Sequence, residues 1–163
     1  MRKILLMLFA ILTAGMTAGV AVAADTVYVI RHLQKAAGAD PPLSEIGAAN
    51  ARLLAERLAK SGIKAIFATP TKRAMETAQP LAQKLHVSIT SYDPRDPAAL
   101  VAKVARVNGA ALVVGHSNTV PELVAAFGGS KPGLLTEQDY GTIFVVKSGS
   151  AAVQELELSR PAN

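Results

Sequence analysis

The segment VYVIRH, residues 27–32, is an apolar run that ends in an arginine and a histidine. A second apolar run, LVVGH at residues 112–116, also ends in a histidine. Short runs of this kind, rich in valine and isoleucine, are typical of strands buried in a parallel sheet. Ligands bind at the carboxyl ends of the strands in open α/β sheets. We therefore expect His32 and His116 to lie at a ligand site.

The rest of the sequence alternates between short apolar runs and longer segments rich in alanine and leucine. Strands that alternate with helices are joined by crossover connections, which produce a mainly parallel sheet. The expected strands lie at about residues 26–30, 63–68, 87–92, 110–115, 142–147 and 152–158. The expected helices lie at about residues 44–61, 71–85 and 97–107, with a last helix that follows Asn118 or Thr119 and ends near Gly128.

Local signals mark the ends of these elements. Ser44 and Asp96 are expected to cap helices, and Pro80 is expected to kink or divide its helix because proline lacks an amide proton. The Gly/Ser connection at residues 148–150 predicts a hairpin. We expect an α/β fold: a three-layer sandwich with a mainly parallel central sheet, helices on both faces and a C-terminal antiparallel hairpin.

Residues 1–24 have the pattern of a secretory signal peptide, with a basic start, an apolar middle and small residues before Asp25. An uncleaved membrane anchor is the alternative, because the apolar stretch is long enough to span a membrane. Threonines and glycines dilute its second half, however, and no basic cluster follows it. We expect cleavage near Ala24, one domain over residues 25–163 with no stable membrane insertion, and a periplasmic or secreted location.

The composition narrows the possible chemistry. The chain has 17 basic and 12 acidic side chains, a balance too mild to indicate a nucleic-acid partner. It has no cysteine, which excludes thiol catalysis, thiolate metal sites and disulfides. Nothing in the sequence sets the oligomeric state.

Basic and imidazole groups follow three of the expected strands. Arg31 and His32 end the first, Arg73 comes shortly after the strand at 63–68, and His116 ends the strand at 110–115. A single arginine or histidine after a strand usually belongs to a surface loop or to a pair with a structural role. Three of them at one end of a parallel sheet indicate a cationic pocket that holds an imidazole nucleophile, which is the chemistry of phosphoryl transfer through histidine.

Four motifs in order resemble the histidine phosphatase superfamily, also called phosphoglycerate mutase-like. They are VIRH at 29–32, PLSEIG at 42–47, ATPTKRAMETAQPLA at 68–82 and VVGHSNT at 113–119, and together they span nearly all of the expected mature chain. The resemblance implies that His32 becomes phosphorylated and that Arg31, Arg73 and His116 bind the phosphoryl group. The chain looks like a small exported bacterial-type member.

Physical reasoning supports these roles. Neighbouring arginines disfavour the imidazolium form of His32 and attract a phosphate dianion. The planar guanidinium groups of Arg31 and Arg73 can each donate paired hydrogen bonds to phosphate oxygens and stabilise charge in the transition state. Ser117 and Asn118 follow His116 at an expected helix start and are further candidates for substrate binding, and Lys35 can reach the mouth of the pocket.

We expect no cofactor and no metal at this site. A metal centre built from His32 and His116, with His86 or an aspartate as a third ligand, is the alternative, but two adjacent arginines would repel a divalent cation. His86 more simply ends a helix, and Thr69 and Thr71 are as well explained by local backbone contacts as by phosphate binding.

The general acid that protonates the leaving group is the least determined part. Many relatives carry a carboxylate in the loop after the third strand or next to the second histidine, but here Ser117 and Asn118 follow His116. Asp93 and Asp96 remain, and Asp93 is the first candidate because Asp96 is also a good helix cap. Gln34 stands where many relatives have an acid, which leaves substrate selection open.

The sequence therefore predicts a metal-independent phosphatase of the histidine acid phosphatase type. It would transfer phosphate from a small phosphomonoester, or from a phosphohistidine in a phosphoprotein, to His32 and then to water. A noncatalytic phosphate-binding or anion-binding envelope protein on the same fold is the alternative. A phosphomutase is less favoured, because the compact chain has little room for a lid that would exclude water.

Overall fold

A computed structural model of the chain describes residues 24–158. Except for Ala24, the expected signal peptide lies outside the described residues. Within residues 24–158, no helix combines the length and the apolar character needed to cross a membrane.

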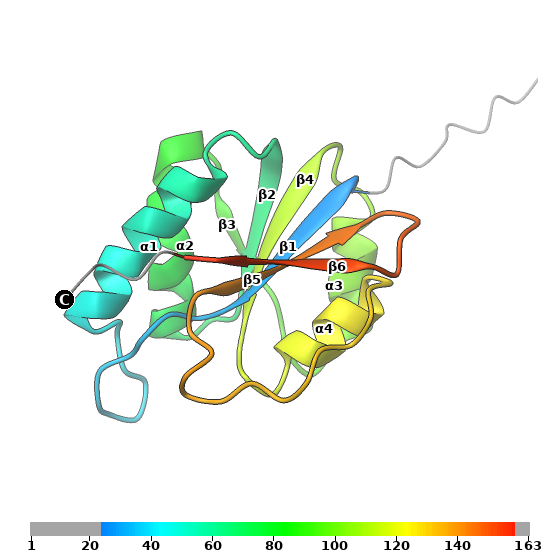
Figure 1. Cartoon of the computed structure of the whole chain (residues 1–163). Coiled ribbons are helices and arrows are strands. Elements are labelled where there is room, and N and C mark those ends of the chain that lie inside the picture. The colour runs from blue at the N-terminus through cyan, green and yellow to red at the C-terminus, as the bar shows by residue number, and fades with distance from the viewer. Residues whose placement is uncertain (1–23, 159–163) are drawn as a thin grey trace, which may run out of the picture.

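A six-stranded sheet forms the middle layer of the molecule (Figure 1), with the strand order β3-β2-β4-β1-β5-β6. The strands are β1 (Thr26–Arg31), β2 (Ile63–Ala68), β3 (Ile89–Ser91), β4 (Ala110–Gly115), β5 (Thr142–Lys147) and β6 (Val153–Glu157). The strands β3, β2, β4 and β1 pair in parallel, whereas β5 pairs antiparallel with both β1 and β6. The mainly parallel sheet and the C-terminal antiparallel hairpin are confirmed.

Two helices cover each face of the sheet (Figure 1). The helices α1 (Glu45–Leu58) and α2 (Lys72–Leu85) pack on one face, and α3 (Pro97–Val104) and α4 (Val120–Ala126) on the other. Successive strand residues point to opposite faces, so Ile30 joins the core under α1 and α2 while its neighbour Val29 joins the core under α3 and α4. The sheet is therefore buried on both sides, as its continuous apolar runs indicate.

The predicted caps are present. The Ser44 side chain accepts a hydrogen bond from the Gly47 amide at the start of α1, and the Asp96 side chain accepts one from Ala99 at the start of α3. The helix α3 ends earlier than expected, at Val104, because the amides of Arg106 and Val107 bond three residues back in a tight turn.

Two local features differ from expectation. Pro80 does not divide α2, which runs unbroken from Lys72 to Leu85 because its buried face is held against α1 and the sheet. The strand β3 is only three residues long, because the Val87 amide donates to Ala82 and completes the end of α2 before the chain can pair with β2.

The loop that follows His32 is tied to the start of α1. The Gln34 carbonyl accepts hydrogen bonds from the Ser44 amide at 2.9 Å and the Ser44 hydroxyl at 3.2 Å. Gly47 packs directly on this carbonyl, and a Cβ on Gly47 would lie 2.0 Å from the Gln34 oxygen. Only glycine leaves room for this contact, which fixes the backbone just beyond the nucleophile candidate.

We expect Gly47→Ala to lower the free energy of unfolding by about 2–3 kcal/mol, because the added methyl group must push the backbone at Gln34 away. Chemical denaturation measures the change. Gly133→Ala is the matched control, since open space surrounds Gly133 and the expected change is within about 0.5 kcal/mol. Equal stability of the two variants would contradict the proposed packing constraint.

Candidate active site

The carboxyl ends of β1, β4 and β2 lie side by side and carry the candidate residues. Arg31 is the last residue of β1, His32 follows it, and His116 follows β4. The His32 amide donates to the Gly115 carbonyl at 2.9 Å, which extends the parallel ladder by one residue. The two imidazole rings therefore meet edge to face, with centroids 5.3 Å apart.

His32 is held as a neutral imidazole with a defined tautomer. Its Nδ1 lies 2.8 Å from the Leu33 carbonyl oxygen. Because a carbonyl only accepts, Nδ1 carries the hydrogen and Nε2 keeps its lone pair. Burial, supported by the neighbouring His116 and the two arginines, lowers the pKa of His32 to about 4, against the opposing effect of the Leu33 hydrogen bond. The ring therefore presents an unprotonated Nε2 at neutral pH.

His116 is held by threonines on two sides. Its Nε2 lies 2.9 Å from Thr69 Oγ1, and its backbone amide donates to Thr119 Oγ1 at 2.9 Å. Burial, followed by the charges of Arg73 and Arg31, lowers the pKa of His116 to about 4. Thr69, whose role the sequence left open, thus contacts a site histidine and is fully buried.

Arg73 enters the site from the first turn of α2. Its Nη1 lies 3.6 Å from Asp40 Oδ1, and its Nε is buried without a hydrogen-bond partner. Thr77 connects this helix to the nucleophile loop, because its hydroxyl donates to the Arg73 carbonyl at 2.7 Å and accepts from the Leu33 amide at 3.0 Å. One threonine therefore sets the position of Arg73 relative to His32.

Arg31 is almost fully buried and is held by a segment far away in the sequence. Its Nη1 donates to the Thr136 carbonyl and its Nη2 to Glu137 Oε1, each at 2.6 Å. The Tyr140 ring stacks on the guanidinium, with the central carbon 4.1 Å from the ring centroid. The Nε of Arg31 is buried and unpartnered, like that of Arg73.

Sequence reasoning missed Thr136, Glu137 and Tyr140. They lie in the long connection between α4 and β5, which passes the end of the sheet where β1 ends (Figure 1). Glu137 and Tyr140 stand three residues apart in TEQDYG, residues 136–141, but no periodic or turn signal there points toward Arg31. Only the position of β5 beside β1 brings them together.

A solvent-filled hollow of about 390 Å³ collects most of the predicted site residues. It is lined by Arg31, His32, Lys35, Arg73, His116, Ser117, Asn118 and Glu137. His86 lies elsewhere, exposed at the end of α2, where its amide caps the helix. Within residues 24–158, no three histidine or acidic side chains are grouped as a metal would require.

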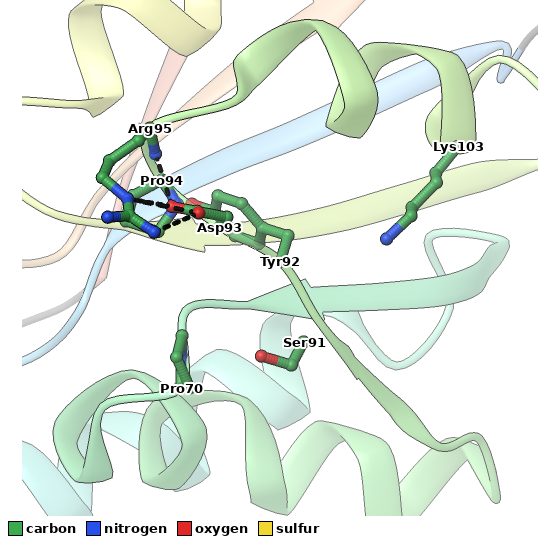
Figure 2. A pocket seen from close by; sticks show the side chains of 7 residues that line it. All are labelled: Pro70, Ser91, Tyr92, Asp93, Pro94, Arg95 and Lys103. Atoms are coloured by element: carbon green, nitrogen blue, oxygen red, sulfur yellow. Dashed lines mark hydrogen bonds and ion pairs between the residues drawn. The ribbon is translucent and has the colours of Figure 1, made fainter.

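The two acid candidates of the β3–α3 loop do not line this hollow. Asp93 lines a separate one, where Arg95 folds back over its carboxylate (Figure 2). Hydrogen bonds from the side chain and backbone of Arg95 lower the pKa of Asp93 to about 2. Asp96 accepts the Ala99 amide as the cap of α3. Because neither Asp93 nor Asp96 lines the hollow that holds His32, this arrangement disfavours both as the acid.

The arrangement is suited to transfer of a phosphoryl group. A neutral imidazole nitrogen faces a pocket flanked by two guanidinium groups that each keep an unpaired, buried Nε–H. Phosphate oxygens are strong acceptors for such donors. The pocket therefore combines an imidazole with positive charge where a transferring phosphoryl group would gain negative charge.

Comparison with known proteins points to the same chemistry. Residues 27–94 match the family model of the histidine phosphatase superfamily, branch 1. This match covers less than half of the chain, and over those residues the chain is similar to the histidine phosphatase superfamily. No curated protein matches its sequence significantly.

Solved structures of several phosphatases have the same fold. The protein histidine phosphatase SixA, solved in complex with tungstate, is 25% identical, with a TM-score of 0.62 over 80% of this chain and 94% of SixA. A putative α-ribazole-5′-P phosphatase from Escherichia coli is 15% identical, with a TM-score of 0.66 over 84% of this chain and 98% of that protein. A mycobacterial glucosyl-3-phosphoglycerate phosphatase is 16% identical, with a TM-score of 0.62 over 82% and 97% of the two chains. These last two likenesses show the fold alone.

The lowered pKa values of His32 and His116 predict the pH dependence of stability in this protein. Both lie near 4 in the folded protein, below the ordinary 6.5. As pH falls below about 6.5 the unfolded chain binds protons that the folded chain does not, so the free energy of unfolding decreases until the folded pKa is passed. Urea unfolding between about pH 7 and pH 4 measures this loss, and His32→Asn should reduce its slope. An NMR titration midpoint of His32 near its ordinary value would contradict the prediction.

Proposed function

We propose that the protein is an exported phosphatase that hydrolyses a small phosphomonoester, or phosphohistidine in a phosphoprotein, through a phosphohistidine intermediate on His32. The observation that supports this most directly is the free Nε2 of His32 between the two arginines. A binding protein would need the arginines but not an unprotonated imidazole with a fixed tautomer. The match to the histidine phosphatase family model and the likeness to SixA support a phosphatase, and the substrate within that class is part of the proposal.

The first step forms a bond between His32 Nε2 and phosphorus while the bond from phosphorus to the leaving group breaks. Arg31, Arg73 and His116 hold the oxygens of the transferring group, and Ser117, Asn118 and Lys35 line the side from which the rest of the substrate enters. In the second step a water oxygen bonds to phosphorus, the P–N bond breaks, and its electron pair returns to Nε2. The Leu33 carbonyl holds the Nδ1 proton through both steps and stabilises the charge that forms on the ring.

We propose that this chemistry needs no metal, because the guanidinium groups already supply the charge that a cation would otherwise provide. The substrate is bound as an anion by donors of the protein alone. Turnover that falls on treatment with a chelator and returns with zinc or magnesium would contradict this part of the proposal.

His32→Ala is expected to abolish turnover of 4-nitrophenyl phosphate while leaving the fold intact, since alanine cannot form the phosphoramidate. Mass analysis of the wild-type protein, quenched during turnover without acid, should find phosphate on His32. The matched control is His86→Ala, which removes an exposed histidine outside the hollow and should retain activity. Full activity of the His32→Ala protein would end the proposal.

We further propose that residues 1–24 are removed on export, which leaves a periplasmic or secreted domain of residues 25–163. The basic start, the apolar middle and the small residues before Asp25 support this. Fractionation followed by N-terminal sequencing should find a chain that starts near Ala24 or Asp25 in the soluble fraction. A full-length chain that stays in membranes after a carbonate wash would instead favour the anchor.

A further inference from the structure

The Thr136–Tyr140 segment forms one side of the hollow and brings a carboxylate to it. Glu137 Oε1 accepts from Arg31 Nη2 at 2.6 Å, and Glu137 Oε2 accepts from the Tyr140 hydroxyl at 2.7 Å. The Tyr140 ring lies against Arg31 and also faces His32, with ring centroids 6.0 Å apart. The carboxylate is thus bonded to Arg31 and lines the same hollow as His32.

Among the residues that line the hollow, Glu137 is the only acidic one. Arg31 and His32 are buried at its floor, with 2% and 3% of their surface exposed, whereas the Glu137 side chain is 68% exposed. In-line attack from His32 places the leaving group opposite the nucleophile, on the solvent side of the phosphorus. The leaving oxygen must therefore pass the mouth of the hollow, where Glu137 lies.

We propose that Glu137 is the general acid that protonates the leaving group, a role that rests on the proposed phosphatase function. In the free protein Glu137 is an ion-pair partner of Arg31. A bound phosphoryl dianion takes up Arg31 donors and brings negative charge next to the carboxylate. Both changes favour the protonated carboxyl, so substrate binding itself prepares the acid.

The charged and titratable groups around Glu137 are consistent with this sequence of events. Hydrogen bonds from Tyr140 and Arg31, with a smaller effect from Lys35, hold the pKa of Glu137 below its usual range in the free protein. A phosphate dianion bound to Arg31 would compete with Glu137 for this arginine and so remove one cause of the low pKa of Glu137. Tyr140 stays bonded to the carboxylate from the other side and keeps it at the mouth.

The proton balance closes over the two steps. As the P–N bond to His32 forms, the electron pair of the P–O bond moves to the leaving oxygen, which takes the proton of the Glu137 carboxyl and departs as an alcohol. In the second step the Glu137 carboxylate takes a proton from the attacking water as the P–N bond breaks. Phosphate leaves, and Glu137 releases this proton to solvent as it pairs with Arg31 again.

The alternative is that Glu137 only holds Arg31 in place. The two interpretations differ in their dependence on the leaving group, because an alkoxide needs a proton to depart whereas 4-nitrophenolate does not. If Glu137 only holds Arg31, its replacement should lower kcat/KM equally for both kinds of substrate. If Glu137 is the general acid, its replacement should lower kcat/KM for alkyl phosphates only.

The experiment compares kcat/KM of the mature protein and its Glu137→Gln variant on glycerol 1-phosphate and on 4-nitrophenyl phosphate. This parameter reports the first step, so a slower second step does not obscure the comparison. We expect Glu137→Gln to lower kcat/KM for the alkyl phosphate by about 100-fold or more and to change that for 4-nitrophenyl phosphate little. The matched control is Glu122→Gln, which removes a surface carboxylate paired with Lys131 and should change neither value.

A second measurement tests the other half of the cycle. If Glu137 also accepts the proton of water, Glu137→Gln should release 4-nitrophenolate in a burst equal to the enzyme concentration, followed by slow turnover with phosphate held on His32. Equal losses on both substrates, or no loss on either, would overturn the role of Glu137. Failure of the phosphatase proposal looks different, because the wild-type protein would then turn over neither substrate and form no phosphohistidine.

Discussion

Arg31 is a charged side chain that is almost wholly buried, and a guanidinium in such a place must be met by acceptors and negative charge. The Arg31 guanidinium is contacted by a carbonyl, a carboxylate and an aromatic face, all from the segment between α4 and β5. This requirement determines the path of that segment past the end of the sheet. It also leaves one edge of the guanidinium free, at Nε, beside the hollow.

The same burial determines the chemistry of His32. A histidine in contact with water near two arginines would gain little from its surroundings, because water screens the charges. Here, removal from water is the main reason for the low pKa, and the cationic neighbours add to it. The protein therefore keeps a neutral nucleophile next to two fixed positive charges, a combination that attracts phosphate without protonating the imidazole.

The geometry around these residues is held by hydrogen bonds of modest individual strength. Thr77 connects the amide beyond His32 to the carbonyl of Arg73, and Gly47 packs on the carbonyl of Gln34. Each contact joins the nucleophile loop to a different helix of the same face. Small changes at either position would move His32 relative to Arg73, and phosphoryl transfer is sensitive to such displacements because it depends on positioning.

The sequence by itself determined the strands, their buried character, the helix caps and the histidines and arginines at the strand ends, because periodicity and caps are local and parallel strands end at one edge. It could not determine that Pro80 leaves α2 whole, because packing on both sides outweighs the missing hydrogen bond.

Nor could the sequence identify Glu137 and Tyr140, which reach Arg31 across more than 100 residues of chain. Asp93 had the better sequence argument as an acid, yet its carboxylate is taken by Arg95 outside the hollow. Which carboxylate meets the site depends on the pairing of β5 with β1, a contact between distant segments that only the tertiary structure decides.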